Sequence, residues 1–239
     1  MIAPGRLRGV TVIPPGGGEV IGDSPERRVE IVCDHPLLNA TVSRYGPGRD
    51  GADLHVHLAH SDLFYVLDGE LTVRLGPADR QVRVATGSLA RVPPGVVHGF
   101  RNASEADVRY LNFHAPGQRF ADYLRALRDG RTFAYDQFVP PPDGGLDPAS
   151  AQVSADAEVL ADVEALRVAV GEAVAEPRHE HPDQLEALYV LSGELALTVG
   201  DEEARAPAGA WVQIEPGVPH AVEPRGAARV VAVHAPGRA

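Results

Sequence analysis

Ten histidines lie in this 239-residue chain, and several of them share one short spacing pattern. His55 and His57 stand two residues apart, Asp62 follows them, and His98 comes later in the chain. In an extended strand, residues i and i+2 face the same side, so we expect the imidazoles of His55 and His57 to project together. Imidazole nitrogens with a carboxylate favour Fe, Mn, Ni, Cu or Zn over Ca or Mg. The pattern therefore predicts a transition-metal site.

A second set with the same spacing lies in the C-terminal half. His179 and His181 are again two residues apart, and Glu186 and His220 follow at matching positions. We therefore expect one or two divalent transition metal ions per chain. Three imidazoles and one carboxylate leave positions open on a six-coordinate ion for substrate, water or dioxygen. The carboxylates of Asp62 and Glu186 are the candidate catalytic groups, because a ligand of this kind can also accept a proton.

The sequence does not decide which residue supplies the fourth ligand of the first set. Asp62 is one methylene shorter than Glu186, so its reach requires an adjustment of the backbone. His60 lies nearby in sequence and could replace it, or Asp62 could instead hold a hydrogen bond behind the ligands. His114 and His234 each precede Ala-Pro-Gly, and duplication alone explains their recurrence.

The two sets belong to an internal repeat. Tyr65-Val-Leu-Asp-Gly-Glu-Leu71 recurs as Tyr189-Val-Leu-Ser-Gly-Glu-Leu195, about 120 residues later. A repeat of this length has the size of a domain, so it indicates a duplicated domain. We expect an N-terminal domain over residues 1–135, a linker rich in Pro and Gly over 136–150, and a C-terminal domain over 151–239.

Both copies have the sequence pattern of β-strands. Short apolar or alternating runs such as residues 71–75 and 195–199 are bounded by turn residues, as in β-sandwiches and barrels. One helix is expected over residues 118–128, where Phe120, Tyr123, Leu124 and Leu127 recur at helical spacing. A second, shorter helix is expected over residues 154–160.

The two sets, with their flanking glycines and prolines, resemble the two sequence motifs of the cupin superfamily. The first copy departs from the family pattern at Asp62, where Glu is usual, and the second at Pro224, which stands where the first copy has Asn102. Two motifs in tandem make the chain similar to a bicupin, and to the quercetin dioxygenase-like cupins in particular. The residues that carry the resemblance are His55, His57, Asp62, Gly69, Gly87, Pro93, Gly95, His98 and Asn102, and then His179, His181, Glu186, Gly193, Gly209, Pro216, Gly217 and His220.

The resemblance implies an all-β fold of two tandem double-stranded β-helix barrels, also called jelly rolls, with a short connecting helix. Some bicupins keep metal in only one domain, so a single occupied set is compatible with the pattern. A homodimer is expected from the resemblance alone.

Composition and charge exclude several classes of partner. The formal net charge is −11, and an acidic chain is a poor candidate for nucleic-acid binding, which depends on neutralising phosphates. All 22 basic residues are arginine, so Schiff-base chemistry on a lysine is excluded. The sequence has no apolar run of membrane-spanning length. Its single cysteine, Cys33, favours a reducing, cytoplasmic location.

The main functional hypothesis is a metal-dependent oxidoreductase of the dioxygenase type, acting on a small aromatic or enol-type substrate inside a barrel. Apolar side chains that share the inward face with the carboxylates, such as Phe64 and Leu188, are expected near the site. The alternative is a redox-neutral metal enzyme, namely a decarboxylase, isomerase or cyclase acting on a small acid or sugar. That chemistry needs charged groups inside the barrel, such as Arg or Glu directed at a carboxylate. Arg44, Arg91 and Arg109 are available, but we expect them at the surface, and an inward arginine beside the metal would favour this alternative. A binding protein without turnover is the third hypothesis.

Overall fold

The computed structural model describes residues 5–236, and the chain divides into two compact units. We call residues 19–156 the first barrel, and residues 5–18 with 157–236 the second barrel. Apart from one α-helix and one short 3₁₀ helix, the regular elements among the described residues are all strands. The predicted all-β fold with one short α-helix is confirmed.

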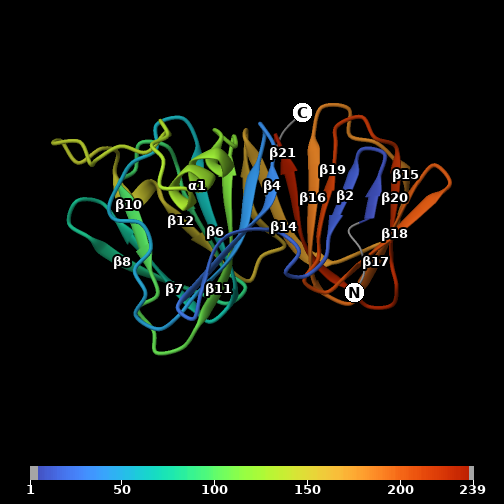
Figure 1. Ribbon diagram of the computed structural model, residues 1–239, viewed down its shortest axis with the longest axis horizontal. Helices are drawn as coiled ribbons and strands as arrows, with labels where there is room; N and C mark the ends of the chain where they lie inside the picture. The colour runs from blue at the N-terminus through green and yellow to red at the C-terminus, as the bar shows by residue number, and fades with distance from the viewer. Residues whose placement is uncertain (1–4, 237–239) are drawn as a thin grey trace. The chain divides into compact units, whose positions relative to one another are not determined.

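The first barrel contains a seven-stranded sheet in the order β12-β9-β6-β11-β5-β4-β3 and a three-stranded sheet in the order β10-β7-β8. The strand pairs of both sheets are antiparallel (Figure 1). Its elements are β3 (Glu19–Ser24), β4 (Arg27–Asp34), β5 (Asn39–Tyr45), β6 (Ser61–Asp68), β7 (Glu70–Leu75), β8 (Arg80–Ala85), β9 (Leu89–Val92), β10 (His98–Arg101), β11 (Val108–Ala115), α1 (Phe120–Arg128), η1 (Pro148–Ser150) and β12 (Gln152–Ser154).

The second barrel repeats this arrangement with a seven-stranded sheet in the order β1-β2-β19-β16-β21-β14-β13 and a four-stranded sheet in the order β15-β20-β17-β18. Its strands are β1 (Gly5–Leu7), β2 (Val10–Ile13), β13 (Val159–Val163), β14 (Leu166–Glu172), β15 (Glu176–His179), β16 (Leu185–Ser192), β17 (Glu194–Val199), β18 (Glu202–Pro207), β19 (Trp211–Ile214), β20 (His220–Pro224) and β21 (Arg229–Ala235).

The N-terminal strands belong to the second barrel. Strand β2 pairs antiparallel with β19, and Val10 and Val12 are buried in the core of that barrel (Figure 1). Strand β12, which lies within the expected C-terminal domain, pairs instead with β9 of the first barrel. The two units therefore differ from the expected boundaries of 1–135, 136–150 and 151–239, because pairing between strands far apart in sequence leaves no local pattern.

Strands β6 and β16 direct the two carboxylates inward. Asp62, Phe64 and Val66 alternate along β6, and the last two are fully buried in the core of the first barrel. Glu186 precedes Leu188 and Val190 in the same way on β16, where these two lie in the core of the second barrel. The expectation that Phe64 and Leu188 share the inward face of the carboxylates is confirmed.

The predicted helix forms as α1 and packs against β3 and β4. Ala121 and Ala126 are buried, while Arg125 reaches back to Glu19 on β3 and Asp34 at the end of β4, at 2.7 Å each. The second predicted helix, over residues 154–160, is wrong. That segment holds the end of β12 and the start of β13, because pairing with β9 and β14 overrides the weak local preference.

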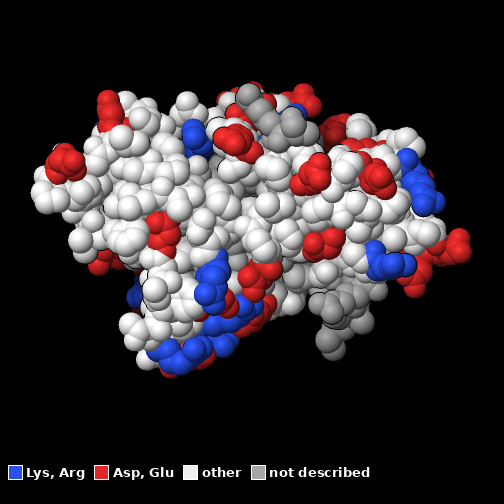
Figure 2. Space-filling model, turned by 90° about the horizontal axis from the view of Figure 1, so that it is seen from above, with Lys and Arg blue, Asp and Glu red and all other residues white. Residues whose placement is uncertain are grey.

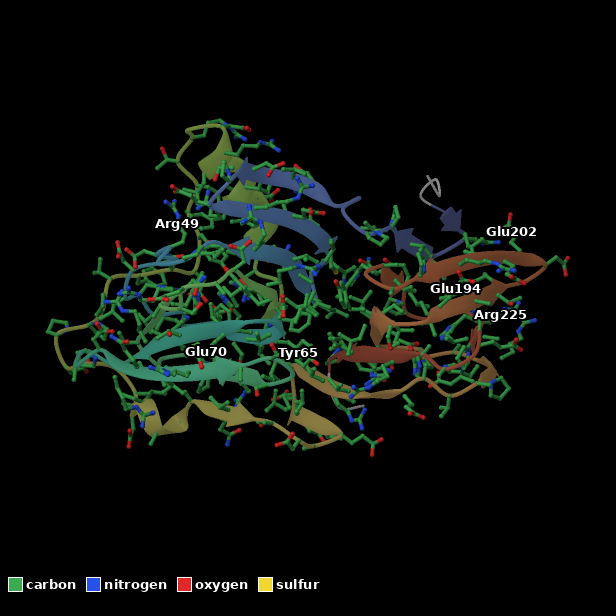
Figure 3. The ribbon with its side chains drawn as sticks, turned by 90° about the horizontal axis from the view of Figure 1, so that it is seen from below. Arg49, Tyr65, Glu70, Glu194, Glu202 and Arg225 are labelled. Carbon is green, nitrogen blue, oxygen red and sulfur yellow. The ribbon has the colours of Figure 1, made fainter. Side chains whose placement is uncertain are left out.

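Two corresponding turns fix the strands that follow β6 and β16. Gly69 and Gly193 have φ values of 81° and 78°, which glycine adopts without strain. A Cβ atom on Gly69 would come within 2.5 Å of the Asp107 carbonyl oxygen, and one on Gly193 within 2.3 Å of that of Ala227. Glu70 and Glu194, labelled in Figure 3, then begin β7 and β17.

Acidic side chains are spread over the face seen in Figure 2, and the basic ones gather mainly in a patch that also contains acidic groups. Many arginines have carboxylate partners, as Arg125 does with Glu19 and Asp34. Within the described residues, no helix has both the length and the apolar character needed to cross a bilayer.

Candidate metal centres

The first barrel brings His55, His57, Asp62 and His98 together. His98 opens β10 and forms an isolated bridge with His55, and Asp62 is the second residue of β6. The ligand atoms of the four side chains all lie within 4.8 Å of one another, and all four residues are buried. His55 Nε2 is 3.1 Å from His57 Nε2, and His98 Nε2 is 3.2 Å from Asp62 Oδ2. The predicted first set is therefore assembled as a compact cluster.

Backbone carbonyls fix the tautomers of the three rings. The Nδ1 atom of His55 lies 2.6 Å from the Asp53 oxygen, and that of His98 lies 2.9 Å from the Val96 oxygen. The Nδ1 atom of His57 is hydrogen-bonded to the carbonyl of Asp136. A carbonyl only accepts, so each Nδ1 carries a hydrogen, and the lone pair of the neutral form of each ring lies on Nε2.

This arrangement fits a bound cation. The lone pairs of His55 and His57 face each other across 3.1 Å with no hydrogen between them. Burial lowers the pKa of His55 to about 4, and the pKa of His57 is lowered further, so protonation does not relieve this contact at neutral pH. A metal ion held by three imidazoles and a carboxylate would satisfy all four groups, and nitrogen and oxygen donors of this kind suit a transition metal.

The carboxylate of Asp62 is oriented by Asn112 of β11. The Asn112 amide N–H donates to Asp62 Oδ1 and, at 3.1 Å, to the Leu63 carbonyl. Oδ2 is left facing His98, which resolves the open question of reach for this shorter side chain. Burial favours the neutral acid, but the neighbouring His114 and His98 outweigh it and hold the pKa of Asp62 well below its usual value.

A group of residues behind the first set was not identified from the sequence. The carboxylate of Asp136 accepts from the backbone N–H groups of Leu58 and Ala59 and lies 2.8 Å from His60 Nδ1. His60 and His114 are both buried, and Tyr135 contacts both of them. His60 therefore does not replace Asp62. His60, which has no histidine counterpart in the second copy, was the sequence feature that could have pointed to this group. Tyr135 and Asp136 lie outside the repeated motifs, so the sequence contained no comparable indication of them.

The second barrel assembles His179, His181, Glu186 and His220, whose ligand atoms also lie within 4.8 Å of one another. Glu186 Oε2 is 3.0 Å from His220 Nε2 and 3.3 Å from His181 Nε2. The side chains of His179 and His181 are 29% and 27% exposed, so this cluster is more open than the first. The buried Nε2 of His181 makes no hydrogen bond, which leaves it available to an ion.

The electrostatics of the second set differ from those of the first. Burial lowers the pKa of His220, but its hydrogen bond with Glu186 outweighs this and raises the pKa above its ordinary value. Burial raises the pKa of Glu186, and the bond from His220 with the nearby His234 brings it below its ordinary value. The hydrogen bond between Glu186 and His220 therefore stabilises the charged form of each group, and a metal ion in the second set would compete with it.

Each barrel has a cavity at its set of candidate ligands. The first cavity has a volume of about 400 Å³ and reaches His55, His57 and Asp62. The second has a volume of about 190 Å³ and reaches Glu186 and His234, with aliphatic and acidic side chains and Arg167 around it. The aromatic walls of the first cavity are Tyr45, Phe100, Tyr110, Phe120 and Tyr123.

The arginines named as candidates for the interior do not line the first cavity. Arg44 pairs with Asp107 at 3.2 Å, and Arg109 is exposed. Arg91 lies on β9 between β6 and β12, and burial lowers the pKa of its guanidinium. Arg27 and Arg128 line the cavity instead.

The chain matches the family model described as "Cupin domain" over residues 41–114 and 166–234, which together exceed half of its length. Among curated proteins, it is 27% identical over 161 residues to quercetin 2,3-dioxygenase of Bacillus subtilis (strain 168), a match covering 66% of this chain and 43% of that protein. The chain thus spans less than half the length of that relative.

Solved structures share the fold at low identity. Protein Ylba from E. coli has a TM-score of 0.68 and 11% identity, over 100% of this chain and 96% of its own. AerE from Microcystis aeruginosa has a TM-score of 0.63 and 14% identity, over 93% and 97%. An oxalate decarboxylase from B. subtilis has a TM-score of 0.59 and 17% identity, over 93% and 76%.

Proposed function

The chain belongs to the cupin domain family, and we propose that it is a metal-dependent oxidoreductase of the dioxygenase type that acts on a small aromatic or enol-type substrate. The observation that carries this proposal is the first cavity, of about 400 Å³, which is lined by His55, His57 and Asp62 together with aromatic side chains. Pockets of this size take small organic molecules, and aromatic walls stack on flat rings. The similarity to quercetin 2,3-dioxygenase supports this substrate class.

His55, His57 and His98 would hold the ion through Nε2, and Asp62 would hold it through Oδ2. A bound Fe, Mn, Ni or Cu ion supplies Lewis acidity and, by changing oxidation state, the electron transfer that dioxygen chemistry needs. The carbonyls of Asp53, Asp136 and Val96 keep the three rings in the tautomer that this role requires.

Asp62 is the group best placed to move a proton in the first barrel. Because Asn112 donates to Oδ1, Oδ2 is the oxygen that faces the cluster, and the lone pair of Oδ2 that does not hold the ion would accept the proton of a substrate hydroxyl. Phe100 and Tyr123 orient a flat substrate between them and the cluster, while Leu124 and Leu127 of α1 keep water from the cavity. Each of these roles belongs to a side chain that lines the cavity or contacts Asp62.

Oxygen uptake tests the proposal. The metal-free protein is loaded separately with iron, manganese, nickel, copper or zinc, and each form is assayed with an oxygen electrode against flavonols and catechol-like compounds. We expect uptake with at least one redox-active metal and none with zinc. Absence of uptake with every metal and every compound rejects a dioxygenase.

A second candidate function rests on Arg27, which lines the same cavity at the end of the β3–β4 turn. A half-buried guanidinium favours a substrate with a carboxylate, and thus redox-neutral decarboxylation, isomerisation or cyclisation of a small acid. Release of carbon dioxide from small carboxylic acids without oxygen uptake would support decarboxylation. Arg27→Leu should then abolish turnover of the acids, whereas the dioxygenase proposal predicts that it leaves flavonol turnover within about threefold. Binding without any turnover would leave a ligand-binding protein.

A further inference from the structure

Three polar atoms behind the first set form a closed triangle. His60 Nε2 lies 2.9 Å from His114 Nδ1, and the hydroxyl oxygen of Tyr135 lies 3.0 Å from the first atom and 2.7 Å from the second. His60 and His114 are almost completely buried, at 1% and 2% exposure. The three side chains come from the loop before β6, from β11 and from the segment after α1.

The hydrogen bonds around the triangle show which atoms carry hydrogen. His60 Nδ1 faces the carboxylate of Asp136 at 2.8 Å, so this nitrogen donates and the lone pair lies on Nε2. Asn112 uses its N–H groups on Asp62 and Leu63, so its oxygen faces His114 Nε2 at 3.1 Å and accepts from it. The lone pair of His114 therefore lies on Nδ1.

The triangle contains three short contacts and only one hydrogen, that of the Tyr135 hydroxyl. Two lone pairs, on His60 and His114, are directed at each other across 2.9 Å. At metal–nitrogen bonds of roughly 2.0–2.1 Å, neighbouring ligands at a right angle stand about 2.9 Å apart. The triangle thus has the size of three adjacent ligand positions around one ion.

We propose that His60 Nε2, His114 Nδ1 and the oxygen of Tyr135 form an additional site for a divalent transition ion, distinct from the cluster of His55, His57, Asp62 and His98. Each histidine of the triangle has its second nitrogen held by an acceptor, Asp136 or Asn112, which is the usual support of metal-binding histidines. Binding releases the Tyr135 proton to solvent and leaves a phenolate on the ion. Phe120 stacks on His114 with ring centroids 3.8 Å apart and holds that ring in place.

His57 does not join this site, although its ligand atom also lies close to His60 and His114. Its Nδ1 is bonded to the Asp136 carbonyl, and its lone pair faces His55 at 3.1 Å. The second barrel offers no equivalent triangle among its described residues. Gln184 stands at the position of His60 and donates to the Pro236 carbonyl at 2.9 Å.

Metal counting tests the site independently of the proposed function. Metal-free protein is dialysed against Co²⁺ at neutral pH, and the bound ions per chain are measured for the unaltered chain, for His60→Gln and for the control His35→Ala. We expect His60→Gln to bind one ion fewer and His35→Ala to bind the same number. Equal counts for the unaltered chain and His60→Gln, with both folded by circular dichroism, overturn the proposal. The variant His98→Ala, measured in the same way, reports on the first set. If the first set binds no ion, His98→Ala binds as many Co²⁺ ions per chain as the unaltered chain does.

Tyr135→Phe gives a second readout that does not depend on counting. The unaltered chain loaded with Fe³⁺ should show a phenolate-to-metal charge-transfer band in the visible spectrum, and the variant should lose it. The variant should also bind the additional Co²⁺ at least about 100-fold more weakly, because loss of a ligand exceeds the 10–100-fold cost of losing a ligand's support. A spectrum without this band in the unaltered chain, or a band that survives in Tyr135→Phe, excludes Tyr135 as a ligand and overturns the site as proposed.

Discussion

In the first barrel, Asp62 is held by Asn112, which lies opposite Phe64 in the pairing of β11 with β6. In the second barrel, the matching position opposite Leu188 is Ala232, which has no amide to offer Glu186. The shorter carboxylate thus has an amide that orients it, and the longer one reaches His181 and His220 by itself at 3.3 and 3.0 Å. The four ligand positions are the same, but their support differs. Duplication has preserved the donor atoms while the surrounding residues changed separately in each copy.

The cavities of the two barrels also differ, both in volume and in the side chains that line them. The first is about twice as large as the second, and it is lined by aromatic side chains together with the candidate ligands His55, His57 and Asp62. The second reaches Glu186 and His234 between small aliphatic side chains. If the proposed turnover takes place, this difference in size and lining favours the first cavity as its location.

The largest expected effect separates the two barrels by activity. His98→Ala removes a ligand of the first set and should lower turnover by about 100-fold or more, because loss of a ligand exceeds the 10–100-fold cost of losing its support. His220→Ala removes the corresponding ligand of the second set and should leave turnover within about threefold. Oxygen uptake at saturating substrate measures both. Equal losses in the two variants would contradict the assignment of turnover to the first barrel.

Asn112→Ala makes the support of the first set resemble that of the second. Without the amide, the buried Asp62 loses its orientation, and we expect the first set to bind its ion about 10- to 100-fold more weakly. Competition with a chelator measures this affinity. Asn102→Ala is the matched control, since this buried amide donates only to the carbonyls of Tyr45, Gly46 and Ala106. It should lower stability and leave the metal affinity unchanged, and a similar loss of affinity in both variants would exclude a specific role for Asn112.

The two clusters of candidate ligands could be predicted from the sequence because the spacing that brings them together is local and occurs twice. The two-residue spacing of His55 and His57 places both rings on one side even though the segment forms only an isolated bridge, not a strand. Asn112 could not be predicted as the support of Asp62, because the copy has Ala232 at that position and only the pairing of β6 with β11 brings the two residues together.

Asp136 and the N-terminal strands also make contacts that could not be predicted from the local sequence. The segment after α1 has the composition of a linker, yet the carbonyl of Asp136 fixes His57 and its carboxylate fixes His60. Strand β2 has ordinary alternation, which predicts a strand but not its partner β19. In both cases the path of the chain, which residue types do not encode locally, determines the contact.

Acidification should destabilise the first barrel more than the second in the metal-free protein. Burial lowers the pKa of His55, His57, His60 and His114 in the first barrel, whereas in the second barrel the pKa of His234 is lowered and that of His220 is raised. Burial lowers the pKa of His55 to about 4, so between pH 6.5 and 4 the unfolded chain binds more protons and the first barrel loses stability, by on the order of 1 kcal/mol per pH unit. The raised pKa of His220 gives stability that is present below pH 6.5 and is lost as the pH rises through the folded pKa.

Thermal unfolding followed by two signals can separate these effects. The single tryptophan, Trp211, is buried on β19, a strand of the second barrel, so its fluorescence follows that barrel, while far-ultraviolet circular dichroism follows both. On acidification from pH 7 to 5, the circular dichroism transition should move to lower temperature more than the fluorescence transition. Identical shifts would show that the two sets do not titrate as their surroundings require.

The smallest expected effect concerns α1, which covers the first cavity and has no counterpart in the second barrel among the described residues. Arg125 ties this helix to Glu19 and Asp34, and exposed or half-exposed ion pairs contribute about 0.2–1 kcal/mol each. Arg125→Gln should therefore lower the stability of the first barrel by about 1 kcal/mol and raise KM by a few fold with little change in kcat, because Leu124 and Leu127 of the helix line the cavity. Arg205→Gln is the control in the second barrel, where Arg205 pairs with Glu194 at the surface. An unchanged KM in Arg125→Gln, despite lower stability, would mean that the helix shields the cavity through its apolar contacts alone.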